Sequence, residues 1–263
     1  MAPFIAIEDQ LMYSGGMVTD GRIHYAGYDH VWDDYAAMVR QYAAQTSTTR
    51  VLDIGGGANP EMTLDEVESY GLRYVLLDIS PKELAKAPDG YEKVVADIGD
   101  PGGIVHNGPF DLIFSCTVIE HIADPQRMYR NILDLLRPGG YAIHLFPTLY
   151  DPAFIANRLF PEALSEAILL KLQPHRTGSG DSAKFPAYYR WCRGPTKRQL
   201  RRMQSVGFEV LSYRAYFGTG YIDRLKVFVP FNRWLQRQLL RLRSPYLTSY
   251  ALVVLRRPAT AVN

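Results

Sequence analysis

An apolar run that passes directly into three consecutive glycines constrains this chain more than any other feature of its sequence. Residues 51–54 (Val-Leu-Asp-Ile) have the composition of a buried strand, and residues 55–57 are all glycine. Glycine adopts backbone angles closed to other residues and lets a ligand approach the main chain. Pro60 suits the first turn of a helix, whose free N–H groups would face that ligand. The segment therefore predicts a strand, a nucleotide-binding turn and a helix.

Apolar runs alternate with helical periodicity downstream of this turn. Such alternation is typical of parallel βαβ units. The expected strands are 50–54, 73–78, 92–96, 110–116, 140–146, 208–214 and 249–256, and the expected helices after the first strand are 60–70, 81–87, 124–136 and 195–206. The predicted fold class is α/β: a doubly wound, seven-stranded, mainly parallel sheet with helices on both faces and cap insertions.

The glycine segment and the motifs after it resemble those of the class I S-adenosylmethionine (SAM) methyltransferases. The resemblance covers about residues 50–147 and depends on the order and spacing of five segments. These are Val51–Pro60, Tyr74–Asp78, Val94–Ile98, Phe110–Cys116 and Leu136–Tyr141. A nicotinamide dinucleotide fingerprint is disfavoured, because Pro60 stands where its last glycine belongs. The resemblance implies SAM as cofactor, S-adenosylhomocysteine (SAH) as its product, and an antiparallel last strand.

The resemblance also implies which residues bind the cofactor. Asp53 would face the methionine ammonium, and Gly55 and Gly57 would let the backbone pass beside the ligand. Asp78 would accept hydrogen bonds from both ribose hydroxyls, because a carboxylate offers two acceptors. Asn59 replaces the family's third glycine, and asparagine tolerates left-handed backbone angles. The other implied contacts are Asp97 with the adenine amino group, Ile79 and Ile98 with the adenine faces, and Ser115 or Cys116 with the methionine side.

Methyl transfer to a hydroxyl needs an aligned acceptor and a base. His121, directly after the fourth strand, is the best-placed candidate, followed by His144 in the fifth strand and by Asp124. Each histidine has a structural alternative, which is a loop-fixing hydrogen bond for His121 and a satisfied core position for His144. Metal-dependent RNA 3′-end methyltransferases would carry a glutamate in place of Thr117, so we expect no metal.

The chain length fits one domain with insertions. We expect an N-terminal helical lid over 1–49, with a helix over 30–45, and a core over 50–147. A cap insertion over 148–194 follows, because long insertions at the carboxyl edge of a sheet usually cover the substrate. The remaining parts are core elements at 195–214 and 249–257 and a basic amphipathic insertion over 215–248.

Charge is divided unevenly along the chain. Residues 1–147 hold 10 Lys and Arg against 21 Asp and Glu, whereas residues 148–263 hold 19 against 6. The basic half favours an anionic partner, or it is simply attracted to the acidic half. The leading hypothesis for the acceptor is a hydroxyl of a saccharide or small metabolite, as in glycan or natural-product biosynthesis. RNA methylation is an alternative, although no RNA-binding module is present, and a non-catalytic SAM-binding scaffold protein at a membrane is another.

The segment 231–243 combines an apolar helical face with a row of arginines. Docking onto its own domain or a partner is one interpretation, and a peripheral contact with the anionic inner face of a membrane is the other. The two cysteines and the absence of eighteen consecutive apolar residues favour a cytoplasmic protein. No sequence feature specifies an oligomeric state.

Overall fold

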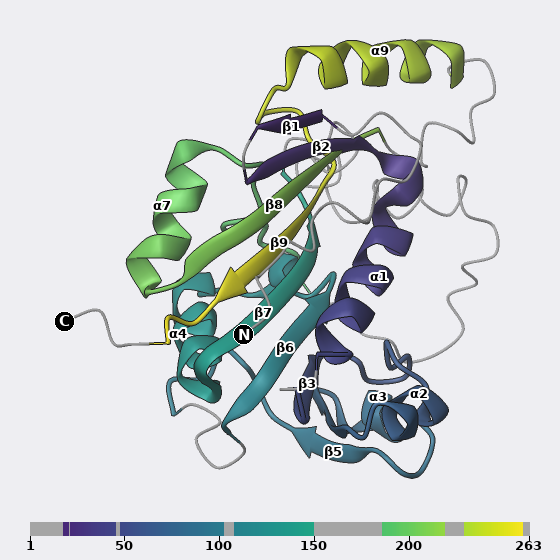
Figure 1. Ribbon diagram of the computed structural model, residues 1–263, viewed down its shortest axis with the longest axis vertical. Coiled ribbons are helices and arrows are strands. Elements are labelled where there is room, and N and C mark those ends of the chain that lie inside the picture. Colours follow the sequence, from purple (N-terminus) through teal and green to yellow (C-terminus); the bar gives the residue numbers. More distant parts are fainter. Residues whose placement is uncertain are drawn as a thin grey trace, which may run out of the picture.

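The computed structural model describes residues 18–20, 22–45, 48–102, 108–149, 186–218 and 229–259. Within these ranges, nine strands form one sheet in the order β1-β2-β8-β9-β7-β6-β3-β4-β5 (Figure 1). The strands are β1 (Val18–Asp20), β2 (Ile23–Gly27), β3 (Arg50–Ile54), β4 (Arg73–Asp78), β5 (Glu92–Val95), β6 (Phe110–Cys116), β7 (Leu136–Pro147), β8 (Glu209–Phe217) and β9 (Tyr250–Arg256).

The seven expected strands are all present, and the sheet is mainly parallel. Strands β3, β4, β5, β6 and β7 pair in parallel, whereas β9 is antiparallel to both β7 and β8. The antiparallel last strand implied by the family resemblance is therefore confirmed. It lies between β7 and β8 in the sheet, so the chain inserts its last strand between two earlier ones.

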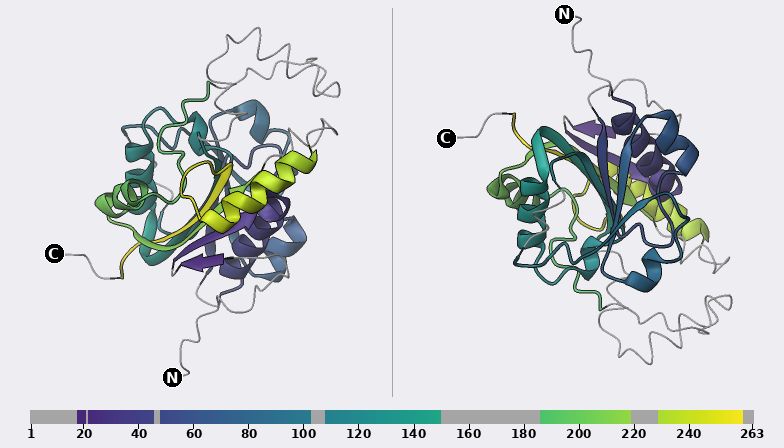
Figure 2. Two further views of the ribbon diagram at one scale, coloured as in Figure 1. Left: turned by 90° about the horizontal axis from the view of Figure 1, so that it is seen from above. Right: turned by 90° about the horizontal axis from the view of Figure 1, so that it is seen from below.

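Helices cover both faces of the sheet, as predicted. Helix α1 packs on one face, and α4 and α7 lie together on the other (Figures 1 and 2). The described helices are α1 (Val31–Ala43), α2 (Leu64–Ser69), α3 (Pro81–Leu84), α4 (Pro125–Leu135), α7 (Lys197–Val206) and α9 (Val229–Leu242), with 3-10 turns η2 (Tyr28–His30) and η3 (Ile119–His121).

The strand order reverses direction at β3. The chain runs outward from β3 through β4 to β5 and then returns to place β6 on the other side of β3, with Val51 opposite Leu112 and Ile54 opposite Ser115. In such sheets the crevice outside the carboxyl ends of the strands at the reversal is the usual ligand site. The glycine turn lies directly at this crevice, because it follows β3.

The N-terminal segment differs from the helical lid that the sequence suggested. Helix α1 agrees with the predicted helix over 30–45, but β1 and β2 precede it and extend the sheet beyond β8. The reason is non-local pairing: Ile23 to Gly27 find their hydrogen-bond partners at Tyr213 to Phe217, far away in sequence.

Two predicted insertions are described only in part. The cap, 148–194, lies largely outside the described ranges, which resume at residue 186. The basic insertion, 215–248, is described up to residue 218 and again from residue 229, where it forms α9.

A buried ion pair joins the acidic N-terminal half to the basic C-terminal half. Asp34 on α1 accepts a hydrogen bond from the Tyr216 hydroxyl at 2.8 Å, and its carboxylate lies 3.6 Å from the Arg214 guanidinium. Arg214 and Asp34 are 6% and 9% exposed, so water screens this pair only weakly. The pair therefore fixes α1 against β8.

We expect Asp34→Ala to lower the free energy of unfolding by roughly 3 kcal/mol, because it leaves the buried Arg214 charge uncompensated. Urea unfolding measures the effect. Asp33→Ala is the matched control, since Asp33 lies in the same helical turn but is exposed. A loss for Asp34→Ala no larger than the control's would contradict this role.

Candidate active site

The glycine turn closes the carboxyl end of β3 tightly. Gly55 has a φ of 79°, which is in the left-handed region that favours glycine. Its N–H donates to the Leu77 carbonyl at 2.7 Å, and a Cβ at this position would collide with the side chain of Val118. Gly55 is thus required by both backbone conformation and space, and its predicted contact with the cofactor is compatible with this geometry.

Asp53 lies beneath this turn and is only 3% exposed. Its carboxylate accepts hydrogen bonds from the Tyr74 hydroxyl at 2.7 Å and from the Glu61 N–H at 3.1 Å. Burial raises the pKa of Asp53 to about 7, although both hydrogen bonds act in the opposite direction. A cation bound nearby would favour the ionised form, so this carboxyl is suited to the methionine ammonium.

The helix after the glycines begins later than predicted. The sequence suggested a start at Pro60, but α2 begins at Leu64, with Thr63 as its N-cap. The reason is a capping box, in which Thr63 and Glu66 satisfy each other's backbone N–H groups, and this is a stronger start signal than a proline alone. The glycines therefore lead into an irregular segment rather than directly into a helix N-terminus.

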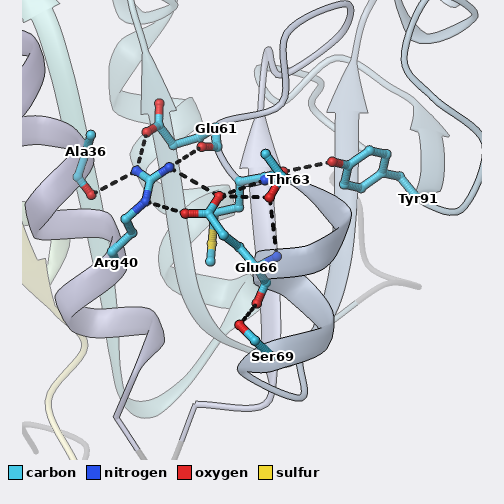
Figure 3. Close-up of polar contacts among 8 residues, drawn as sticks. Ala36, Arg40, Glu61, Thr63, Glu66, Ser69 and Tyr91 are labelled. Atoms are coloured by element: carbon cyan, nitrogen blue, oxygen red, sulfur yellow. Dashed lines mark hydrogen bonds and ion pairs between the residues drawn. The ribbon is translucent and has the colours of Figure 1, made fainter.

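Arg40 of α1 holds this irregular segment in place (Figure 3). Its guanidinium donates to the carboxylates of Glu61 at 3.0 Å and Glu66 at 2.6 Å, and to the Ala36 carbonyl at 3.2 Å. The hydrogen bond with Glu66 raises the pKa of Arg40 and lowers that of Glu66. The N-terminal helix thus fixes the loop that follows the glycines. Sequence reasoning missed Arg40, because nothing local marks it as a partner of this loop.

Asp78 stands at the end of β4, close to the glycine turn. Its Oδ1 accepts a hydrogen bond from the Ser80 N–H at 2.8 Å. A Cβ added at Gly57 would lie 2.7 Å from Oδ2 of Asp78, so glycine is needed there for the two segments to approach. The negative charge of Asp78 also contributes to the raised pKa of Asp53. The fold therefore brings together Asp53, Gly57 and Asp78, as the family resemblance implied.

The residues predicted to contact adenine differ in their accessibility. Ile79 is 52% exposed, an unusual position for a large apolar side chain next to a polar crevice. Asp97 is also exposed, and its carboxylate accepts a hydrogen bond from the Gly99 N–H at 2.7 Å. Ile98, in contrast, is 3% exposed and packs in the main hydrophobic core. Burial favours a structural role for Ile98, whereas Ile79 and Asp97 remain available to a ligand.

Ser115 and His144 form a buried pair on neighbouring strands. The Ser115 hydroxyl lies 2.8 Å from Nδ1 of His144, and burial lowers the pKa of this histidine to about 3. His144 is fully buried and packs edge-on against Tyr129. Burial and the low pKa favour a core position for His144 over a role as a base, and of its two ring nitrogens only Nδ1 has a hydrogen-bond partner among the described residues. Burial also raises the pKa of the neighbouring Cys116 to about 12, so its thiol is not a nucleophile at neutral pH.

His121 is half-buried at the carboxyl end of β6, in the turn η3. Its Nδ1 lies 3.2 Å from the Pro186 carbonyl oxygen. A carbonyl can only accept, so Nδ1 carries the proton in the neutral ring and Nε2 is the basic nitrogen. Glu120 Oε1 lies 3.9 Å from this Nε2, and burial raises the pKa of Glu120 to about 8. The turn therefore joins a partly accessible histidine to a buried carboxyl group that sequence reasoning did not select.

The described end of the cap is fastened to this turn. The N–H groups of Tyr188 and Tyr189 donate to the Glu120 carbonyl at 2.7 and 3.0 Å, and Arg190 donates to the Ala123 carbonyl at 2.7 Å. An open hollow of about 300 Å³ lies beside these contacts. Its lining consists of Ala187, Tyr188, Tyr189, Arg190 and Arg193. An aromatic and cationic surface is thus placed next to His121.

Tyr35 is a second residue of α1 that sequence reasoning missed. Its hydroxyl is buried and has no hydrogen-bond partner within the described residues. Burial and the charge of Asp53 raise its pKa well above the usual value, so it stays protonated and can donate. Buried donors usually have a partner, so this unpaired hydroxyl near Asp53 is a candidate for a ligand contact.

Comparison with known proteins identifies the family. A family model described as a methyltransferase domain matches residues 28–213, which include β3 to β7 and the site described above. The chain belongs to this methyltransferase family. The methyltransferase is 33% identical over 139 residues to an uncharacterized methyltransferase of Mycobacterium sp. (strain KMS), over 48% of this chain and 51% of the relative. It is 31% identical over 96 residues to the ubiquinone biosynthesis O-methyltransferase of Caulobacter vibrioides, over 34% and 37% of the two chains.

The methyltransferase spans about half the length of the mycobacterial relatives that it matches. Its fold is similar to that of phosphoethanolamine N-methyltransferase 2 from Haemonchus contortus, solved in complex with SAM. The TM-score is 0.53 at 16% identity, over 86% of this chain and 53% of that chain. The family match and the shared fold confirm the resemblance to class I SAM-dependent methyltransferases, and with it SAM as the cofactor.

Neither a metal-binding cluster nor a membrane-spanning helix occurs among the residues that the structure describes. In the part of the chain that the structure describes, no three His, Cys, Asp or Glu side chains form a group able to hold a metal ion. Over the same ranges, no helix combines the length and the apolar character needed to cross a membrane.

Proposed function

We propose that this methyltransferase transfers the methyl group of SAM to a hydroxyl of a saccharide or small metabolite that carries an anionic group. The proposal rests mainly on the position of His121, whose turn follows β6 at the crevice and is fastened to the aromatic, cationic hollow of the cap. In the transfer, the bond from sulfur to the methyl carbon breaks while the bond to the acceptor oxygen forms. His121 Nε2 accepts the hydroxyl proton, and SAH leaves.

The cofactor supplies an activated methyl group, and the residues around the crevice hold it. Asp53 would pair with the methionine ammonium and Asp78 with the ribose hydroxyls, while Tyr35 has a free donor for the methionine carboxylate. Ile79 and Asp97 would contact adenine. Support for this arrangement comes from the convergence of two carboxylates, a buried unpaired hydroxyl and an exposed isoleucine at one sheet edge.

The hollow beside His121 supports an acceptor with a ring and a negative charge. Tyr188 is 39% exposed and presents a ring on which a sugar or planar ring can stack. Arg190 lies 6.0 Å from the centre of this ring, and Arg193 lines the same hollow. Guanidinium groups bind phosphate and carboxylate in a bidentate manner. Both guanidinium groups also donate to backbone carbonyls, Arg190 to Ala123 and Arg193 to Tyr189 and Cys192, so their positions are fixed at the hollow, and together with the Tyr188 ring they support an acceptor that carries a ring and a negative charge.

Product analysis tests this proposal. The purified protein is incubated with SAM carrying a radioactive methyl group, together with fractionated small molecules, RNA and protein from the same cells. Label in an alkali-stable methyl ether of a small molecule supports the proposal. Label in RNA or protein would instead assign a macromolecular substrate, and SAM binding without turnover on any fraction would favour a non-catalytic SAM-binding protein.

His121→Gln is expected to lower kcat by about 100-fold or more and to leave the Kd for SAM unchanged, because general-base catalysis contributes factors of this size. Steady-state kinetics and calorimetry measure the two quantities. Asp124→Asn is the matched control, since Asp124 is the other candidate base in this loop and is exposed. If Asp124→Asn loses the activity and His121→Gln keeps it, the base has been assigned wrongly.

A cytoplasmic location and a role in glycan or natural-product biosynthesis complete the proposal. Both cysteines are free thiols, which fits a reducing compartment. The O-methyltransferase relative acts, by its name, in ubiquinone biosynthesis, so the wider group includes enzymes of small-molecule pathways.

A further inference from the structure

Helix α9 attaches to the domain through one face only. Gln236 donates to the Phe217 carbonyl at 2.9 Å and lies over Gly27 and Gly218, at the ends of β2 and β8. Leu239 and Leu240 pack on a small cluster that contains Tyr25 and Phe217. Figure 1 shows α9 at the periphery of the domain, beside β1 and β2. The helix is thus fixed in position, and its opposite face points away from the sheet.

That opposite face is apolar and aromatic except for Gln238, which lies between Trp234 and Phe231 on the helical wheel. Phe231, Trp234 and Leu242 are 59%, 51% and 73% exposed. At 100° per residue these three side chains lie roughly opposite Gln236 on the helix. The rings of Phe231 and Trp234 lie 5.9 Å apart, so they form one continuous surface. The sequence placed Leu239 on the same apolar face and left docking and membrane binding as alternatives. In the structure Leu239 packs on the domain, whereas Phe231, Trp234 and Leu242 remain exposed.

A row of arginines runs along one side of the apolar face. Arg233, Arg237 and Arg241 follow each other at intervals of four residues, and all three are exposed. No acidic residue occurs after Asp223 in the whole sequence. An exposed apolar face flanked only by positive charge matches the composition of helices that lie in the interface of anionic membranes.

Charge complementarity decides whether a second copy of the chain or an anionic lipid surface covers the exposed face of α9. A second copy of the chain would bring two rows of arginines together with no carboxylate of this segment to separate them, which opposes association. Anionic lipid supplies phosphates for the arginines and a headgroup region in which Phe and Trp side chains are stable. We propose that α9 binds the surface of an anionic lipid bilayer, with Phe231, Trp234 and Leu242 inserted and Arg237 and Arg241 at the phosphates.

Vesicle co-sedimentation tests the proposal with the full chain, independently of methyl transfer. We expect the protein to bind vesicles of phosphatidylcholine mixed with phosphatidylglycerol about tenfold or more tightly than vesicles of phosphatidylcholine alone, and high salt to weaken this binding. The Trp234 fluorescence should shift to shorter wavelength on binding, and Trp234→Phe should remove that shift. Absence of binding to the anionic vesicles, or equal binding to both kinds, would overturn the proposal.

Paired variants test whether the exposed face of α9 is the surface that binds the vesicles. Phe231→Ser with Trp234→Ser, and separately Arg237→Glu with Arg241→Glu, should each lower vesicle binding about tenfold or more. Two variants serve as controls. Tyr70→Ser changes an exposed residue at the end of α2, and Arg198→Glu with Arg201→Glu changes two exposed residues on α7. Thermal melting shows whether each variant folds. An equal loss of vesicle binding in the controls would show that α9 is not the lipid-binding surface. A wild-type dimer that dissociates when Phe231 and Trp234 are changed would show that a second copy of the chain, and not lipid, covers this face.

Discussion

Asp78→Ala is expected to weaken SAM binding by about 100-fold or more. Two charge-assisted hydrogen bonds to the ribose hydroxyls would be lost, and each contributes roughly 1.5–3 kcal/mol, so about 3 kcal/mol in total is a conservative estimate. Asp78→Asn should fall between the wild type and Asp78→Ala, because its side-chain oxygen can still accept from the Ser80 N–H. Isothermal calorimetry with SAM and SAH measures both variants.

The control for this experiment is Asp89→Ala, which removes an exposed carboxylate near the end of α3 and leaves the crevice intact. Its Kd should stay within about twofold of the wild type, and urea unfolding should show that both alanine variants are folded. A folded Asp78→Ala protein that binds SAM as well as the control does would show that the ribose lies elsewhere.

The core strands could be predicted because the pattern that marks each of them is local. Strands such as Val51–Ile54 and Phe110–Cys116 are short apolar runs between polar turns, and their buried positions in the structure follow from that pattern. The convergence of Asp53 and Asp78 was also predictable, because carboxyl ends of neighbouring parallel strands meet at one edge. The family resemblance added the roles of these residues.

The structural features that were not predicted from the sequence have physical causes of two kinds. Strand β2 and Arg40 depend on partners that are distant in sequence, and Tyr35 is notable only because the fold buries its hydroxyl near Asp53, so no local pattern marks any of the three. The late start of α2, in contrast, was visible in the sequence, since Thr63 and Glu66 form a capping box that competes with Pro60. The two histidines differ as candidate bases because His144 is buried and His121 is not. The burial of His144 arises because β7 lies between β6 and β9, which the sequence does not show.

The affinity for SAM is expected to fall as the pH is lowered below about 7. Asp53 has a pKa of about 7 in the protein without ligand, so below this pH it must lose a proton before it can pair with the methionine ammonium. Each pH unit well below the pKa then costs up to about tenfold in Kd. Asp53→Asn should bind SAM more weakly at pH 7.5 and show a much smaller pH dependence. Calorimetry from about pH 5.5 to 7.5 measures the slope.

The same group has an opposite effect on the stability of the protein without ligand. The pKa of Asp53 in the folded protein lies above the usual value of 3.8 for an aspartate, so between about pH 4 and pH 7 the folded state binds more protons than the unfolded state. Stability should therefore decrease as the pH rises through this window, and Asp53→Asn should remove that decrease. Glu61→Gln is the matched comparison, because burial also raises the pKa of Glu61. If Glu61→Gln abolishes both slopes and Asp53→Asn neither, the titrating group beneath the glycine turn is Glu61, and the ammonium contact assigned to Asp53 is wrong.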